Sequence, residues 1–262
     1  MWSFNNQTQS LFEQICSLFT PPCLLCNGFS ANLDNYCPGC YADLPHNHYC
    51  CAICALPFDT NLGASILCGD CLRQPPHLAH GFDQALVALH YLPPISSLVH
   101  ALKDHDNQAA GRLLAACLYQ YIHLNNPDLP QLILPMPLHK KRLQQRGFNQ
   151  AKVIGKLLSK RFGISLNDRI IKREKDTASQ QGLNKQQRRS NLRQAFTISP
   201  SASVRKILAE VQHIAIVDDV MTTGASANAV AKALRKAAGH ELHIDVWCVA
   251  RTLPPNSKLH LY

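Results

Sequence analysis

The sequence predicts an α/β protein with a doubly wound, mostly parallel β-sheet, preceded by a small module held together by metal ions. After Gly81, short apolar segments that suit strands alternate with longer segments whose apolar residues recur every three or four positions. Before Gly81, long periodic segments are absent and C-x-x-C pairs recur instead. A length of 262 residues suits one main domain and one small one.

The composition narrows the class of protein. Apolar residues make up 46% of the chain, which is enough to form a core. The sequence contains no run of 18 apolar residues, and its first 20 residues carry Glu13 but no Lys, Arg or small-residue cleavage site. We therefore expect neither a transmembrane segment nor a signal peptide. The expected location is the cytoplasm, including a peripheral position at the inner face of the membrane.

The chain divides into three expected parts. Residues 1–22 form an amphipathic helix that ends at a proline pair, with apolar residues Leu11, Phe12, Ile15, Leu18 and Phe19 at helical spacing. Residues 23–76 form a double zinc ribbon, a module too small to fold without its metals, and residues 73–76 serve as a linker. Residues 81–262 form the α/β domain.

The α/β domain should alternate strands and helices. We expect strands at residues 85–91, 132–135, 213–217 and 242–250. We expect helices at residues 95–105, 109–123, 147–162 and 225–238. Gly163 and Gly239 follow the last two helices, where glycine commonly adopts the left-handed conformation that ends a helix.

The cysteines form four C-x-x-C pairs. Two intervening residues allow a tight turn that directs both sulfurs at one tetrahedral metal, and two such turns complete a four-thiolate shell. Four sulfurs leave no open coordination position, so we predict two structural zinc ions. Sequential pairing closes the shorter loops and is favoured over interleaved pairing, although the spacing permits both. The expected ligand sets are Cys23, Cys26, Cys37 and Cys40, then Cys51, Cys54, Cys68 and Cys71.

Other interpretations of these residues remain open. Disulfides are disfavoured because ten of the twelve cysteines cluster between Cys16 and Cys71 in a tandem of pairs, which indicates metal binding in a reducing compartment. An iron–sulfur cluster uses similar ligands, but the spacing is that of zinc ribbons. Cys16, Cys50, Cys117 and Cys248 lie outside the pairs and are interpreted as buried apolar residues or spare thiols. The thirteen histidines show no ligand spacing and are interpreted as surface or packing residues.

The most informative segment is residues 213–226, HIAIVDDVMTTGAS. A buried strand ends at Asp218 and Asp219, and the carboxyl ends of strands are where open α/β sheets bind ligands. We expect both carboxylates to be solvated and to contact ribose hydroxyls or hydrated Mg²⁺, because burying two unpaired charges is costly. The following loop offers hydroxyls and helix-opening amides that suit a phosphate monoester: Thr222, Thr223, Gly224, Ala225 and Ser226.

The acidic pair has two simpler interpretations. A Walker B acid requires a G-x-x-x-x-G-K-[ST] loop, and the nearest segment, Gly155-Lys156-Leu157, lacks the first glycine and the hydroxyl residue. Alternatively, the carboxylates are a solvated strand end and Thr223-Gly224 is a helix cap. The full string is more specific than a lone cap, which favours a ligand site.

At this point the sequence resembles a known family. Residues 218–226 resemble the phosphoribosyl pyrophosphate (PRPP) signature of type I phosphoribosyltransferases, and further motifs are similar to the ComF/GntX competence proteins. These motifs are the C-x-x-C ribbons, Leu102-Lys103, Pro135-Met136-Pro137-Leu138, Arg146-Gly147-Phe148-Asn149-Gln150-Ala151, Gln181-Gly182-Leu183, Arg189-x-Asn191 and Ala195-Phe196. The resemblance covers nearly the whole chain. It implies a phosphoribosyltransferase fold, zinc ribbons, and the handling of incoming single-stranded DNA during natural transformation.

The resemblance also interprets a cationic segment. Residues 139–193 carry 16 Lys and Arg against 3 Asp and Glu, whereas the rest of the chain is slightly acidic within a formal net charge of +9. A longer basic closing loop corresponds to residues 172–193. The alternative is that many of these cations only solvate an exposed face. The residues that occupy the pyrophosphate loop or lie close to it are Pro137, Leu138, His139, Lys140, Arg142 and Arg146.

Two functions follow from these assignments. The favoured one is a competence protein that binds PRPP or a related sugar phosphate, contacts single-stranded DNA through Lys185, Arg188 and Arg189, and works with DNA-uptake or processing proteins. Single-strand binders combine cations with aromatic side chains that stack on the bases, and the aromatic residues in or beside the basic segment are only Phe148, Phe162 and Phe196. DNA affinity should therefore be largely electrostatic.

The alternative is an active phosphoribosyltransferase in nucleotide metabolism that displaces pyrophosphate from PRPP with a nucleobase or amine, without DNA contact. Asp218 and Asp219 would hold the ribose, residues 222–226 the 5-phosphate, and Mg²⁺ with the basic loops the pyrophosphate. The sequence marks neither a general base nor an acceptor pocket.

Overall fold

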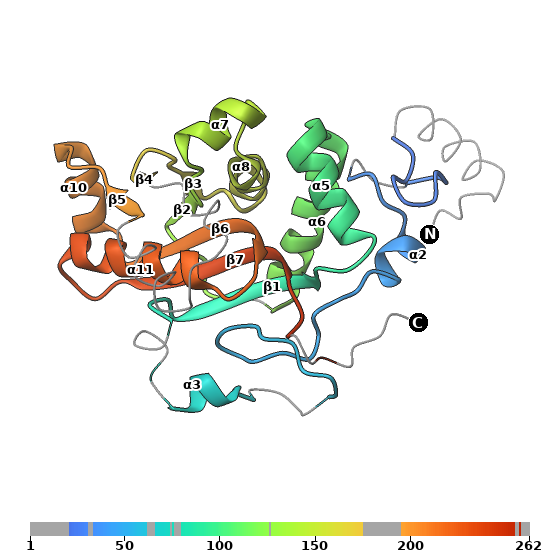
Figure 1. The fold of residues 1–262 in the computed structure, drawn as a ribbon, viewed down its shortest axis with the longest axis horizontal. Coiled ribbons are helices and arrows are strands. Elements are labelled where there is room, and N and C mark those ends of the chain that lie inside the picture. Colours follow the sequence, from blue (N-terminus) through green and yellow to red (C-terminus); the bar gives the residue numbers. More distant parts are fainter. Residues whose placement is uncertain are drawn as a thin grey trace, which may run out of the picture.

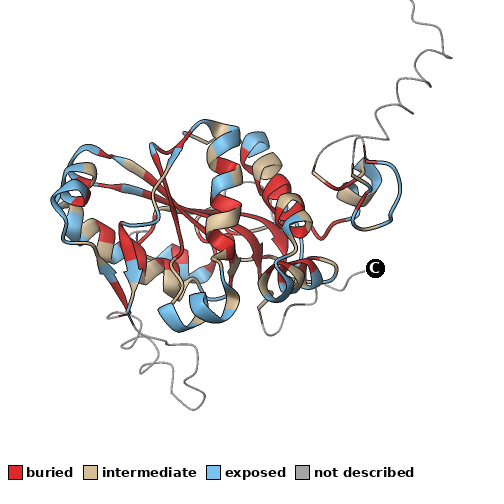
Figure 2. Cartoon of the chain, turned by 90° about the horizontal axis from the view of Figure 1, so that it is seen from above, coloured by how far each residue is buried: buried red, intermediate tan, exposed pale blue. Residues whose placement is uncertain are grey.

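The fold is a parallel β-sheet between two layers of helices, as the sequence predicts (Figures 1 and 2). The computed structural model describes residues 21–30, 34–61, 66–73, 75, 80–125, 127–174, 195–254 and 257. The helix expected at residues 1–22 therefore lies almost wholly outside the described residues. Within them, no helix combines the length and the apolar character that crossing a membrane requires.

The main sheet has five parallel strands in the order β1-β7-β6-β2-β3. From β2 the chain moves outward to β3, and from β6 it moves the opposite way to β7, so the winding direction reverses between β2 and β6. Ligands bind open α/β sheets at such a reversal, beside the carboxyl ends of the strands. The strands are β1 (Gln84–His90), β2 (Leu132–Pro135), β3 (Ser165–Leu166), β6 (His213–Met221) and β7 (His243–Arg251).

Helices cover both faces of this sheet, which explains why β6 and β7 are almost continuously apolar. Ala215 and Val217 of β6 pack into the core beneath α5, α6 and α8, whereas Ile214 and Ile216 pack into the core beneath α10 and α11. The helices are α5 (Ile95–His105), α6 (Gln108–Asn125), α8 (Gln150–Phe162), α10 (Ala202–Glu210) and α11 (Ala225–Ala238).

Two boundaries near the reversal differ from the sequence prediction. Strand β6 continues to Met221 instead of ending at Val217, so both aspartates lie within the strand. The helix expected at residues 147–162 begins only at Gln150, because Gly147 has a positive φ of 78° and ends a separate short helix, α7 (Lys140–Arg146). Asn149 then caps α8 by accepting hydrogen bonds from the amides of Ala151 and Lys152.

The two cysteine modules pack on different faces of the sheet. The module that contains α2 (Pro38–Ala42) contributes to the core shared with α5 and α6, and the module that contains α3 (Gly69–Arg73) contributes to the core shared with α11. The chain between them runs along the outer side of β1. Asn47 N donates to Ala88 O at 2.9 Å, and Ala85 N donates to Ile53 O at 2.7 Å. The modules therefore cover the edge of the sheet.

A separate two-stranded antiparallel ladder, β4 (Ile171–Arg173) and β5 (Phe196–Ile198), brackets the predicted closing loop. Glu174 N donates to Ala195 O at 2.8 Å, so the two ends of the intervening segment lie side by side. Residues 175–194, which include Lys185, Arg188 and Arg189, lie outside the described residues.

Gly81, at the entrance to β1, provides a test of how closely the chain there approaches α11. Its φ is +72°, and a Cβ there would lie 2.9 Å from the backbone oxygen of Asn228 on α11. Gly239 has a similar φ of +73° but has no heavy atom within 4 Å of a Cβ. We expect Gly239→Ala to lower the free energy of unfolding by about 1 kcal/mol through backbone strain, and Gly81→Ala by about 2–3 kcal/mol because a clash is added. Urea denaturation measures both, and equal losses would contradict the close approach.

Candidate functional site

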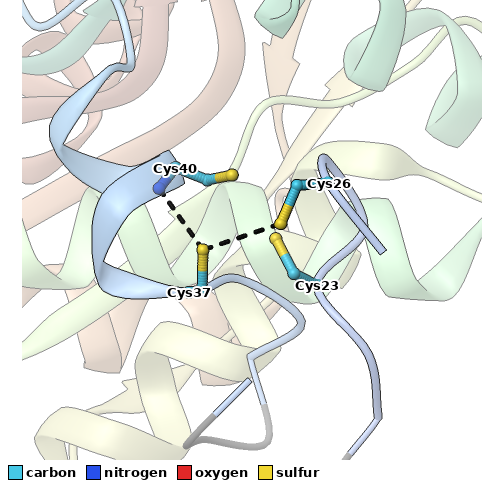
Figure 3. Close-up of side chains that lie close together, drawn as sticks. All are labelled: Cys23, Cys26, Cys37 and Cys40. Atoms are coloured by element: carbon cyan, nitrogen blue, oxygen red, sulfur yellow. Dashed lines mark hydrogen bonds between the residues drawn. The ribbon is translucent and has the colours of Figure 1, made fainter. Parts of the chain in front are cut away.

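Two groups of four cysteines each converge on a common centre (Figure 3 shows the first). In the first group, the sulfurs of Cys26 and Cys37 lie 3.8 Å apart, and the amide of Cys40 donates to the sulfur of Cys37 at 3.4 Å. In the second group, the sulfurs of Cys54 and Cys68 lie 3.6 Å apart. The groups comprise Cys23, Cys26, Cys37 and Cys40, then Cys51, Cys54, Cys68 and Cys71.

These sulfur separations fit a tetrahedral zinc ion. A Zn–S bond of ~2.3 Å places neighbouring sulfurs ~3.8 Å apart, far longer than the ~2.05 Å of a disulfide bond. Each group is sequential along the chain, as we favoured. The hydrogen bond between Cys51 and Cys54 lowers the pKa of the Cys51 thiol to about 4 and raises the pKa of the Cys54 thiol, so the two thiols differ in acidity in the absence of a metal. The two groups can therefore bind two zinc ions.

One histidine joins the second cysteine group to the sheet. His80 Nε2 lies 3.0 Å from the sulfur of Cys71, and the His80 ring stacks on Phe82 with centroids 5.2 Å apart. Phe82 is 1% exposed, and its ring lies 3.8 Å from the position of a Cβ on Gly224. His80 is thus a packing residue that also contacts the sulfur of a predicted metal ligand. The C-x-x-C spacing gave no signal for it, because the contact depends on the tertiary fold.

The segment after β6 lines a pocket at the carboxyl end of this strand. Gly224 has a φ of 73° and begins α11 without a side-chain cap, and Ala225 N donates to Thr223 Oγ1 at 3.4 Å. The pocket measures about 150 Å³. Its lining brings the predicted phosphate-binding residues together with one of the two aspartates: Asp218, Val220, Met221, Thr222, Thr223, Gly224, Ala225, Ser226, Ala227 and Val246.

The two adjacent aspartates have different surroundings. Asp218 lines the pocket, and its Oδ1 accepts the amide of Asp219 at 2.9 Å. Asp219 is 4% exposed and contacts the opposite layer of helices: its Oδ2 lies 2.5 Å from Lys103 Nζ of α5, and its Oδ1 lies 3.5 Å from Gln150 Nε2 of α8. The expectation that both carboxylates are solvated is therefore wrong for Asp219. Successive residues of a strand point to opposite faces, and β6 continues through this pair.

The electrostatics of the pair follow from these positions. Burial, together with the neighbouring charge of Asp219, raises the pKa of Asp218 well above its ordinary value. Burial alone would also raise the pKa of Asp219, but the ammonium group of Lys103 outweighs it and the pKa of Asp219 is lowered. Asp219 is thus the stably ionised member, and Lys103 is a site residue that sequence reasoning noted only within a family motif.

The predicted pyrophosphate loop lies across the reversal, after β2. Met136 N donates to Val217 O at 2.8 Å, which holds the start of this loop against β6. His139 caps α7 by accepting from the amide of Lys141, and Lys140 is exposed. Arg146 NH1 donates to Gln150 Oε1 at 3.4 Å, and Gln150 in turn contacts Asp219. A polar chain therefore runs from α7 to the acidic pair. Pro137, Leu138 and Arg142 are partly exposed in the same region.

The fold and these sites define a class: an α/β protein with a doubly wound parallel sheet, joined to two four-cysteine modules. No protein-family model matches the chain. Among curated proteins, competence protein F of Haemophilus influenzae is 32% identical over 90% of this chain and 99% of its own length. The chain belongs to the competence protein F (ComF) family.

Further relatives carry a different name. DNA utilization protein YhgH of Escherichia coli O157:H7 is 29% identical over 88% of this chain and 90% of its own length. The protein of that name from Salmonella typhimurium is 33% identical over 78% of this chain and 84% of its own length.

The first prediction from this site concerns zinc. The purified chain should carry two zinc ions, and Cys51→Ala should reduce this to one, because three thiolates no longer complete the second shell. Cys50→Ala is the matched control: Cys50 is the neighbouring residue and lies outside both groups, so the zinc content should stay at two. Elemental analysis by mass spectrometry measures the content. Equal zinc in the two variants, or iron in place of zinc, would contradict the assignment.

The second prediction concerns the buried ion pair. Lys103→Met leaves the Asp219 carboxylate buried without its cation, so the free energy of unfolding at pH 7 should fall by about 3–5 kcal/mol. In the parent chain the lowered pKa of Asp219 contributes stability above pH ~4 that is lost as the pH falls through the folded-state pKa. Without Lys103, burial raises the pKa of Asp219, so in the variant this carboxyl takes up a proton as the pH falls from 7 towards 4, and the difference in stability between parent and variant should shrink. Below pH 4 the difference should shrink further, as the parent passes its own folded-state pKa.

Denaturation at several pH values measures this difference. Asp219→Leu combined with Lys103→Met removes both charges and should recover most of the lost stability. A loss in Lys103→Met that is independent of pH would show that packing, and not charge, is responsible.

Proposed function

We propose that the chain takes part in the use of DNA in competent cells, that it binds PRPP or a related sugar phosphate in the pocket after β6, and that its basic segment holds single-stranded DNA. Its relatives are named for competence and for DNA utilization, which supports the general role. The observation that carries the ligand is the pocket itself, where Asp218 faces a loop with a left-handed glycine at a helix start.

The pocket offers the two kinds of group that a ribose 5-phosphate needs. A phosphate would lie over the loop of residues 222–226, where the hydroxyls of Thr222 and Thr223 are exposed and the first turn of α11 presents amides and the positive end of the helix dipole. Asp218 lines the same pocket and is separated from the loop by the last residues of β6. It would accept hydrogen bonds from ribose hydroxyls.

Mg²⁺ would enter with the diphosphate. This ion is usually held by one or two carboxylates together with substrate phosphates and water. Asp218 fits that donor set, whereas Asp219 is already paired with Lys103. The pyrophosphate would then lie toward α7, whose cations face the same edge of the sheet, and Arg146 would connect it through Gln150 to the acidic pair.

We favour a binding role over turnover. Among the described residues that line the pocket, Asp218 is the sole titratable side chain, so the pocket supplies no separate general base. The alternative, transfer of the ribosyl group to a nucleobase or amine, predicts release of pyrophosphate when such acceptors are added. The same preparations used for binding can be assayed for that release.

The third prediction tests the sugar-phosphate site. The parent chain should bind PRPP more tightly with Mg²⁺ than without it, because the cation favours the ionised form of Asp218 against its raised pKa. Asp218→Asn removes that negative charge and should weaken the binding roughly 10- to 100-fold, since a hydrogen bond to a charged group contributes about 1.5–3 kcal/mol. Asp168→Asn is the control, since Asp168 pairs with Lys152 outside the pocket. Isothermal titration calorimetry measures both. Asp219→Asn is unsuitable, because it also leaves the Lys103 ammonium unpaired.

If Asp218→Asn bound PRPP as tightly as the parent chain, PRPP would not bind in this pocket. Absence of any PRPP binding by the folded parent chain would contradict the proposal more broadly and leave a DNA-binding protein without a sugar-phosphate site.

The fourth prediction tests the DNA surface. Single-strand affinity should fall linearly with log salt, with a slope of ~0.7 per neutralised phosphate. Neutralising Lys185, Arg188 and Arg189 together should lower this slope and weaken all sequences alike. Lys236→Gln is the control, because this exposed lysine lies near the end of α11, away from the pocket edge. Fluorescence anisotropy across a salt series measures the slope. An unchanged slope in the triple variant would show that these three residues do not contact the DNA.

A further inference from the structure

A second cluster of ligand-type side chains lies at the amino ends of β6 and β7, at the edge of the sheet opposite the pocket. His213 and His243 are direct register partners on these neighbouring parallel strands. Asp245 is two residues beyond His243, so it lies on the same face as His243. His213 lies 30 residues before His243 in the sequence, and strand pairing brings it beside His243 and Asp245. No local sequence motif therefore marks the three residues as a group.

The three side chains approach one another closely. His213 Nε2 lies 3.0 Å from Asp245 Oδ2, and His243 Nε2 lies 3.1 Å from Asp245 Oδ1. One ligand atom from each residue can be chosen so that all three lie within 4.8 Å of one another. Bonds of ~2.0–2.1 Å from zinc to nitrogen or oxygen place neighbouring ligand atoms of a tetrahedral shell ~3.3 Å apart. The two separations between a histidine nitrogen and an Asp245 oxygen are near that value, and all three chosen ligand atoms lie within 4.8 Å.

The charge balance of the cluster favours a cation. Asp245 is 1% exposed, and a buried carboxylate requires a positive partner. The nearby guanidinium of Arg235 is occupied by Asp83, at 2.5 Å, and by the backbone oxygen of Gly81, at 3.0 Å. Asp245 instead faces the two imidazoles of His213 and His243, and imidazole nitrogens are common ligands of divalent transition metals.

The outer contacts of His243 also suit a metal ligand. Its Nδ1 lies 3.7 Å from Asp83 Oδ2, and Asp83 is fixed by the amide of Ile244 at 2.7 Å. Metal-binding histidines commonly direct their second nitrogen at a carboxylate in this way. With the proton on Nδ1, the Nε2 lone pair would be free to coordinate an ion placed between His243 and Asp245.

We propose that His213, His243 and Asp245 bind a divalent transition-metal ion of the zinc class. Two imidazoles and one carboxylate form a borderline donor set that suits Zn²⁺, Co²⁺ or Ni²⁺. The side chain of His243 is 51% exposed and that of His213 is 15% exposed, so the ion enters from solvent and water completes its shell. The ion links the amino ends of β6 and β7. This site differs in kind from the four-thiolate sites, which are closed.

The experiment uses the full chain without a polyhistidine tag, with both four-cysteine sites loaded with Zn²⁺, and Co²⁺ as the probe. Equilibrium dialysis should show one additional Co²⁺ per chain while the zinc is retained. Its visible spectrum should show the ligand-field bands of nitrogen and oxygen ligation without the charge-transfer bands of thiolate ligation.

Two variants and one control make the assignment specific. His243→Gln changes a half-exposed side chain and should keep the fold, whereas Asp245→Asn changes the buried ligand; each should weaken Co²⁺ binding at least 10-fold. His100→Gln is the matched control, because His100 lies 3.4 Å from Asp104 in an exposed pair without a third ligand. The affinity of this variant for Co²⁺ should equal that of the parent chain. A parent chain that binds no third ion would show that the cluster shares a proton instead. That result, or equal binding by His243→Gln and the parent, would overturn the proposal.

Discussion

The structure depends on the burial of β6 between two layers of helices. Because β6 is central and parallel, each of its side chains must meet one layer or the other, and a charged residue is tolerated only with a partner. Lys103 of α5 supplies that partner for Asp219, at 2.5 Å. The pair fixes α5 against the strand at the point where the winding reverses, and it leaves Asp218 as the carboxylate that faces the pocket.

The cysteine modules support this arrangement from the edge of the sheet. They pack into both cores and hydrogen-bond along β1, which would otherwise be an open edge strand. The second module also reaches the ligand edge: Cys71 contacts His80, His80 stacks on Phe82, and Phe82 lies under Gly224. This chain of contacts connects the second cysteine group to the loop after β6.

The two edges of the sheet have different chemistry. At the carboxyl edge, amides, hydroxyls, Asp218 and the cations of α7 suit an anionic sugar phosphate. At the amino edge, two imidazoles and a buried carboxylate suit a metal cation. The strands β6 and β7 connect these edges, so an ion bound at one end would contact the same two strands that carry the pocket at the other.

The sequence by itself determined the features that are local in the chain. Helix α5, strand β2 and helix α11 lie at the predicted residues, since apolar periodicity decides them. The cysteine groups follow from C-x-x-C spacing for the same reason. Only the tertiary structure decided features that depend on distant residues. Lys103 neutralises Asp219 from another helix, and α7 separates from α8 at Gly147. His213 meets Asp245 through strand register, which no local pattern encodes.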